Sequence, residues 1–141
     1  MELEFAAEGV AAEAVYPISF VQGCKTETGV TPVLLDWAPM IEAILADVQR
    51  GVPVGEISAK FHNALAEVIV GVARRIGERR VVLSGGCFQN RNLTERAVTR
   101  LRAEGFQPYW HQRVPPNDGG IALGQIVAAL RGYGASVTSS A

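Results

Sequence analysis

The chain has 141 residues, of which 48% are hydrophobic and 19% charged, a composition typical of one globular domain rather than of a disordered segment. Its 13 basic residues nearly balance 14 acidic ones, so its charge favours neither a nucleic-acid partner nor a membrane partner. No apolar run approaches the roughly 18 residues that a membrane span needs. Cys24 and Cys87 are isolated, as is usual in a reducing compartment. We therefore expect a cytoplasmic domain.

The first half of the chain predicts short elements around a polar loop. Its opening segment, MELEFAAEGVAAEA, begins like the middle of a helix with no N-cap residue ahead of it, so we expect the chain to be a piece of a longer protein. Asp36 is a suitable cap for the helix that follows the loop. The expected elements are a helix over 2–14, a strand over 16–20, a loop over 22–32, a returning segment over 33–37 and a helix over 37–50.

The longest helix is predicted to begin after Pro53 and to end at Gly77, because glycine is a typical residue at a helix C-terminus. Apolar residues recur in it at steps of three and four, which predicts one buried face. The residues of this expected face are Ile57, Phe61, Leu65, Val68, Ile69, Val72 and Ile76.

A strand–helix–strand–helix pattern follows over 80–131 and predicts two parallel strands with a right-handed crossover. The fold class is therefore α/β, with a βαβα unit and packed helices. The expected elements are a strand over 80–84, a helix that starts at a capping box of Asn92 and Glu95 and ends at Gly105, a strand over 106–110 and a helix over 119–131.

Two Gly-Gly pairs, Gly85-Gly86 and Gly119-Gly120, lie where a predicted strand leads into a helix. Ligands of open α/β sheets gather at such connections, and glycine lets backbone N–H groups approach an anion closely. Both pairs are also common in ordinary tight turns, and no complete phosphate-loop motif is present. Spacing alone leaves phosphate binding and a purely structural turn open.

The segment PPNDGG before the last helix offers a second candidate group. Two glycines in a first helical turn cost about 1 kcal/mol each against alanine, which favours a close approach of some other group to that backbone. Asn117 or Asp118 is expected to cap the helix. Asp118 is either that simple cap or a carboxylate directed at a metal or ligand.

Three further reactive side chains have simpler interpretations. His62 and His111 are 49 residues apart in the sequence, without the spacing of a metal site, and each is expected to be a structural hydrogen-bonding residue. Cys87 follows Gly86 at a helix entrance, where a thiol pKa can fall. No partner histidine is evident, so we expect Cys87 to be a small packing residue.

Three motifs in this chain, FHNALAE, VVLSGGCFQNRNLTE and VPPNDGGIALGQ, strongly resemble the C-terminal part of the HypF family, the carbamoyltransferases that mature NiFe hydrogenases. The resemblance runs from about residue 1 to 131, and the opening MELE looks like an internal stretch of that family. It implies that residues 1–132 form the C-terminal subdomain of the carbamoyltransferase domain, followed by a flexible tail over 133–141. That domain is similar to the tRNA threonylcarbamoyl-adenosine transferases and has the actin-like ATPase fold.

The resemblance also implies a reaction and its partners. HypF proteins make carbamoyl-adenylate from ATP, and their C-terminal domain transfers the carbamoyl group to the C-terminal cysteine of the partner protein HypE. Asp118 is implied to be a ligand of a divalent iron or zinc ion. The residues implied to bind the nucleotide are Ser84, Gly85, Gly86, Asn90, Asn117, Gly119 and Gly120. No side chain is an obvious general base, so the catalytic residues stay unassigned.

This chain departs from the family pattern by what it does not contain. The HxxxH metal ligands of the family are not present in the sequence, so the metal and nucleotide sites would have to be completed by another polypeptide segment. We therefore expect little catalysis and weak ATP binding from this chain alone, and an exposed apolar face that allows self-association. The alternative is a truncated, non-catalytic paralogue that docks on a full-length partner. A third interpretation is an unrelated α/β domain whose glycine turns are structural.

Overall fold

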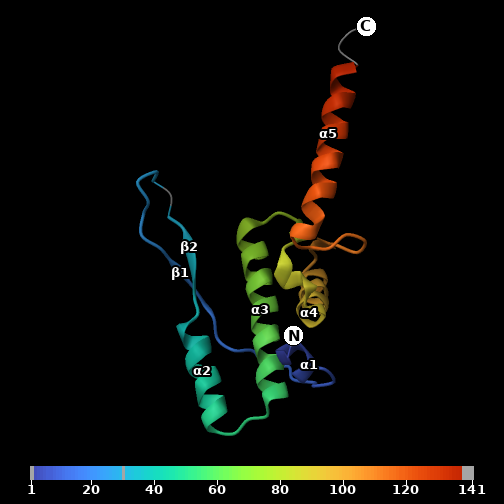
Figure 1. Cartoon of the computed structure of the whole chain (residues 1–141). Helices are drawn as coiled ribbons and strands as arrows, with labels where there is room; N and C mark the ends of the chain where they lie inside the picture. The colour runs from blue at the N-terminus through green and yellow to red at the C-terminus, as the bar shows by residue number, and fades with distance from the viewer. Residues whose placement is uncertain (1, 30, 138–141) are drawn as a thin grey trace.

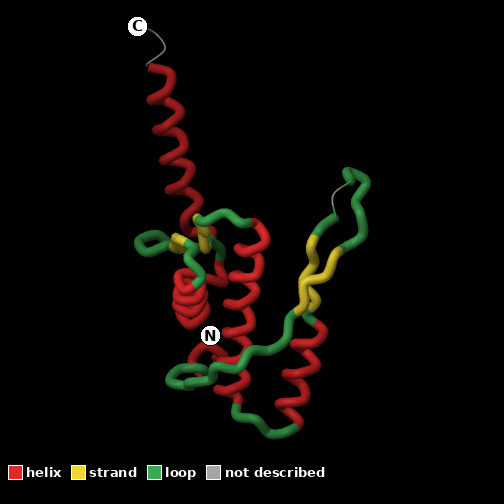
Figure 2. Tube along the Cα trace, turned by 180° about the vertical axis from the view of Figure 1, so that it is seen from behind, coloured by secondary structure: helices red, strands yellow, loops and turns green. Residues whose placement is uncertain are grey.

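The computed structural model describes residues 2–29 and 31–137, arranged as helices around a long central helix, with two small sheets (Figures 1 and 2). The elements are, in chain order, α1 (Glu2–Ala6), β1 (Ser19–Gln22), β2 (Val33–Asp36), α2 (Ala38–Gln49), α3 (Val54–Ile76), β3 (Arg80–Leu83), the 3-10 turn η1 (Gly86–Gln89), α4 (Arg91–Ala103), β4 (Gln107–Trp110), the 3-10 turn η2 (Asp118–Gly120) and α5 (Ile121–Val137).

The central helix α3 is packed on more than one side, and this changes which of its residues are buried. Several of the most buried apolar positions of α3 are small, such as Ala59 and Ala64, because small side chains let neighbouring helices approach closely. The predicted face of large apolar residues is confirmed only in part. Ile69 is half-buried and packs against a core cluster, whereas Val72 and Ile76 are exposed. The predicted end is confirmed, since Gly77 adopts φ 74° at the C-cap.

The strands β1 and β2 form an antiparallel hairpin in which Phe20 lies opposite Leu35. Phe20 attaches this hairpin to α3. A Cβ on Gly71 would come within 2.7 Å of the Phe20 ring, and the guanidinium of Arg75 lies 3.5 Å from the centre of that ring. The contact with Arg75 is a cation–π interaction. The Phe20 ring itself leaves no room for a larger side chain at position 71.

The predicted parallel pair of strands is confirmed: β3 pairs with β4, with Leu83 opposite Trp110. Together with the intervening α4 and the following α5 it makes the expected βαβα unit. A buried core lies between the sheet, α3 and α4; its fully buried members are Val70, Ala73, Leu83, Ala97, Val98 and Leu101.

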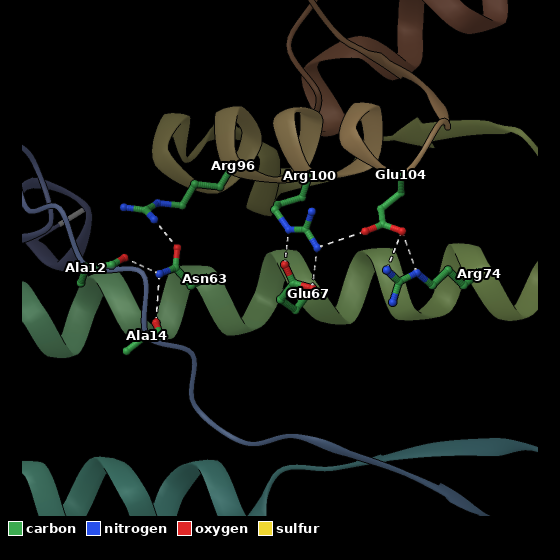
Figure 3. A network of polar contacts seen from close by, with 8 residues as sticks. All are labelled: Ala12, Ala14, Asn63, Glu67, Arg74, Arg96, Arg100 and Glu104. Carbon is green, nitrogen blue, oxygen red and sulfur yellow. Dashed lines mark hydrogen bonds and ion pairs between the residues drawn. The ribbon is translucent and has the colours of Figure 1, made fainter.

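Polar contacts fasten α4 along α3, and Figure 3 shows them in a row. Arg96 binds Asn63, and Arg100 makes a two-point contact with Glu67, in which Nη2 lies 3.1 Å from Oε2. Asn63 also donates to the carbonyl oxygens of Ala12 and Ala14 at 2.7 and 3.0 Å. These contacts hold the segment after α1 against the same pair of helices.

Several predicted boundaries differ from the structure. The helix expected over 2–14 ends at Ala6, and Gly9 turns the chain with φ 75°. The last helix continues to Val137 rather than ending at 131, and residues 138–141 of the expected tail lie outside the described part. In residues 2–29 and 31–137, no helix is both long enough and apolar enough to cross a membrane.

Candidate functional site

The loops that follow β3 and β4 meet at one edge of the parallel sheet, as their positions in the sequence predict. The backbone N–H of Gly85 donates to the carbonyl oxygen of Pro116 at 2.8 Å. One residue earlier, Ser84 Oγ lies 3.0 Å from His111 Nε2, which follows β4 directly. The two glycine-bearing loops are therefore joined by both a backbone and a side-chain hydrogen bond.

The first loop has the geometry of a backbone cradle. Gly85 adopts φ 105° and ψ 162°, a region that is essentially restricted to glycine. A Cβ placed on Gly86 would meet nothing within 4 Å, so the space beside it is open. Gly86 and Cys87 begin η1, and the first N–H groups of a helical turn have no acceptor inside it. This loop can present backbone donors to an anion.

Asn90, at the end of this loop, is held by the protein itself. Its side-chain oxygen accepts from the Leu93 N–H at 2.9 Å, which makes Asn90 the N-cap of α4. The predicted cap at Asn92 is therefore wrong by two positions. The Asn90 amide nitrogen lies 2.9 Å from Nε2 of His62, so one N–H and one oxygen lone pair of the Asn90 side chain remain for another partner.

The second loop is a tight turn stabilised by Asn117. Its Oδ1 accepts from the Gly119 N–H at 3.1 Å, so Asn117 rather than Asp118 caps this turn. A Cβ on Gly120 would lie 2.9 Å from the carbonyl oxygen of Pro115, which explains the glycine there sterically. The Asp118 side chain is exposed and, freed from the capping role, is accessible to a ligand.

The acidic, histidine and cysteine side chains near these loops determine whether a metal ion could be held. In the part of the chain that the structure describes, no three side chains from His, Cys, Asp and Glu lie close enough to hold a metal ion. One carboxylate from Asp118 does not make a metal site. The described residues thus do not fit a complete metal centre.

A small cavity of about 250 Å³ lies beside the two loops. It is lined by Phe88, Gln89, Arg91, Thr94, Glu95, Trp110, His111 and Pro116. Two larger cavities, of about 530 and 510 Å³, lie along α4 and the segment after α1. None of the predicted site residues lines any of these three cavities, so the cavities do not locate the candidate site.

The family described as carbamoyltransferase, Kae1-like domain, second subdomain, matches residues 1–125. The chain belongs to this family. It is 40% identical over 97 residues to the carbamoyltransferase HypF of Synechocystis sp. and 36% identical over 104 residues to a carbamoyltransferase HypF homolog of Cupriavidus necator. These alignments cover 69% and 70% of this chain but only 12% and 26% of those two proteins.

Solved HypF structures share the fold. Full-length HypF, solved in a phosphate- and nucleotide-bound form, matches with a TM-score of 0.77 and 36% identity over 91% of this chain and 20% of its own. HypF of T. kodakarensis matches with a TM-score of 0.63 and 26% identity over 94% of this chain and 17% of its own. The resemblance inferred from the three motifs and the expected fold class are both confirmed.

His62 is buried and hydrogen-bonded, as expected of a structural residue. What the sequence did not predict is its partner, the predicted site residue Asn90. The two lie 28 residues apart in different elements. No local spacing rule connects such positions.

Proposed function

We propose that this chain supplies the nucleotide-binding loops of a HypF-type carbamoyltransferase in NiFe-hydrogenase maturation. In this proposal the carbamoyl group of carbamoyl-adenylate is transferred to the C-terminal cysteine of a HypE-like protein. The observation that carries it is the hydrogen bond between Gly85 and Pro116. That bond brings together two loops whose sequences independently resemble one nucleotide site.

The chemistry of the first loop supports a phosphate at this place. A phosphate oxygen beside Gly86 could accept from the N–H groups of Gly86 and Cys87, and a Cβ on Gly86 would meet nothing within 4 Å. The Ser84 hydroxyl lies next to this position and is oriented by His111. The first loop would bind ATP or carbamoyl-adenylate from one side, through Ser84, Gly85, Gly86 and Asn90. The second loop would bind it from the other side, through Asn117, Gly119 and Gly120. These groups would act by positioning and by charge stabilisation.

Asp118 would supply one ligand of a divalent iron or zinc ion, whose remaining ligands come from another polypeptide segment. A cation beside nucleotide phosphates neutralises their charge. Because the described residues hold no complete site, we expect this chain by itself to turn over no carbamoyl phosphate.

Titrating ATP into the chain, with and without Fe²⁺ or Zn²⁺, tests this proposal. Ser84→Ala and Gly86→Ala should weaken ATP binding in both conditions, whereas Asp118→Asn should remove only the effect of the metal. Asp36→Asn is the matched control, because Asp36 is a carboxylate that accepts from the Ala38 N–H at 3.0 Å near the hairpin. Identical ATP affinities in all variants would contradict the assignment of the site, and turnover by the chain alone would contradict its incompleteness.

One observation favours the second candidate function, a non-catalytic docking module. The helix α5 projects away from the rest of the chain (Figure 1). Its exposed apolar side chains are Ile121, Leu123, Ile126, Val127 and Leu130. Exposed apolar stripes of this kind commonly mark an interaction surface. Sedimentation at increasing concentrations, compared with a Leu123→Glu variant, tests self-association through α5; docking without any ATP binding would favour this candidate.

A further inference from the structure

We propose that His62 is a positioning residue for the loop of residues 84–90, acting through Asn90. This inference rests on the proposed nucleotide-binding function of that loop. His62 belongs to α3, outside both glycine-bearing loops, and its side chain reaches the end of the first loop from inside the protein.

The surroundings of the His62 ring determine where its proton lies. The residue is 2% exposed, and Nδ1 lies 2.8 Å from the backbone carbonyl oxygen of Ser58. A carbonyl oxygen only accepts hydrogen bonds, so Nδ1 carries the proton. In the neutral ring Nε2 then has a free lone pair, and it accepts from the Asn90 amide at 2.9 Å.

This proton position fixes the orientation of the Asn90 amide. With the NH₂ group directed at His62, the side-chain oxygen is directed at the Leu93 N–H, which it caps at 2.9 Å. The reversed amide would set the NH₂ group against a donor N–H and the oxygen against a lone pair, losing both bonds. Only one orientation satisfies His62 and the helix together.

Asn90 then transmits this orientation to the loop. Its own N–H donates to the Cys87 carbonyl at 3.1 Å, which closes η1. Its carbonyl oxygen accepts from the Thr94 hydroxyl at 2.9 Å, and that hydroxyl also lies 3.0 Å from the Phe88 carbonyl. The direction of the Gly86 and Cys87 N–H groups therefore depends on Asn90, and the side chain of Asn90 depends on His62.

The ring itself is anchored to the N-terminal helix. The Ser58 hydroxyl donates to the Leu3 carbonyl and lies 3.3 Å from His62 Nδ1. In parallel, Glu4 accepts from the Arg91 N–H at 2.6 Å, at the start of α4. Both paths connect α1 to the end of the candidate loop, so the loop is held in place from a segment remote in sequence.

The test separates the hydrogen bond from simple packing. His62→Phe keeps the ring volume and removes the acceptor, whereas His62→Gln retains an acceptor oxygen. In His62→Phe we expect the Leu93 amide to exchange about five- to tenfold faster, the typical effect of a weakened cap, and the NMR signals of residues 84–90 to shift. His62→Gln should restore most of both. The wild-type ring should show the Nδ1-protonated, neutral spectrum.

Met40→Ala is the control for lost stability, because Met40 is buried in a separate cluster with Tyr16 and Ala64 that includes no residue of 84–90. It should destabilise the fold without selective shifts at 84–90. Unchanged loop signals in His62→Phe, or equal shifts in Met40→Ala, would overturn the proposal. If His62→Phe fails to fold, Asn90→Ser replaces it: serine still caps α4 but does not reach His62, so the loop signals must move.

ATP titration of the same variants separates this proposal from the function on which it rests. His62→Phe should lower the ATP affinity by about the same factor by which it speeds the exchange of the Leu93 amide. His62→Gln should restore most of the ATP affinity. Failure of the wild-type chain to bind ATP would contradict the proposed function, while the loop signals would still decide whether His62 positions Asn90.

Discussion

The backbone N–H of Gly85 donates to the carbonyl oxygen of Pro116 at 2.8 Å, which joins the loops that follow two parallel strands. A backbone bond of this kind does not depend on either side chain, so it survives most substitutions in the two loops. What it does require is the conformation of Gly85, and this makes the neighbouring glycines distinguishable by experiment.

Gly85→Ala and Gly86→Ala should differ in their effects on stability: the first should destabilise the fold, and the second should mainly weaken ATP binding. At Gly85 the alanine must adopt φ 105°, and such strain costs about 1–3 kcal/mol of the free energy of unfolding. At Gly86 the new methyl group meets open space, so stability should change by less than about 0.5 kcal/mol while ATP affinity falls. Urea unfolding and ATP titration measure the two effects; equal destabilisation by both variants would contradict the loop geometry.

Tyr16→Phe should destabilise the packing of α2 against α3. The Tyr16 hydroxyl donates to Asp47 at 2.7 Å, and Lys60 donates to the same carboxylate oxygen at 3.1 Å. Both Tyr16 and Asp47 are buried. Loss of one hydrogen bond to a charged group costs about 1.5–3 kcal/mol. Thermal unfolding should show this loss, and Tyr109→Phe, an exposed position, should leave the melting temperature unchanged.

The hydrogen-bonded pair of Tyr16 and Asp47 should lose its contribution to stability at both low and high pH. The hydrogen bonds from Tyr16 and then Lys60 lower the pKa of Asp47 from 3.8 to about 2, so this stabilisation is present above pH 3.8 and is lost as the pH falls toward 2. Burial, and then the bond to Asp47, raise the pKa of Tyr16 from 10.0 to about 12. That contribution is present below pH 10 and is lost as the pH rises toward 12. A pH series of melting temperatures measures both, and the alkaline loss should disappear in Tyr16→Phe.

Arg100→Lys should weaken the contact between α3 and α4 slightly. Lysine cannot reproduce the two-point contact of Arg100 with Glu67, but both side chains are 36% exposed, so the cost should be about 0.5–1 kcal/mol and should shrink in high salt. Arg91→Lys is the control, because its partner Glu95 forms a more exposed pair within α4. A salt-independent loss in Arg100→Lys would show that packing, rather than charge, is responsible.

Local features of the fold were predictable from residues near one another in the sequence. The β-branched run before Ser84 and the periodic segment after it predicted a strand and a helix, and both occur. Gly77 ends α3 in the left-handed conformation as expected. The position of the cap was missed at α4, because the capping-box pattern of Asn92 and Glu95 favoured Asn92. In the structure Asn92 Oδ1 accepts from Arg96 instead, and Asn90 caps the helix.

The buried residues of α3 could be derived only in part from its apolar pattern. Periodicity identifies which residues share a face, but the number of neighbours decides which face is covered. Because α1, α2 and α4 all lie along α3 (Figure 2), small residues such as Ala64 and the polar His62 are buried, while Ile76 stays in solvent.

By itself, the sequence determined the parallel βαβα unit, the positions of the two glycine turns and the family to which the motifs belong, because these depend on residues close together in the chain. Only the tertiary structure decided that Gly85 binds Pro116 and that His62 holds Asn90. Distances between elements, and hence the choice of hydrogen-bond partners, are set by how helices pack, and that packing is a property of the whole chain.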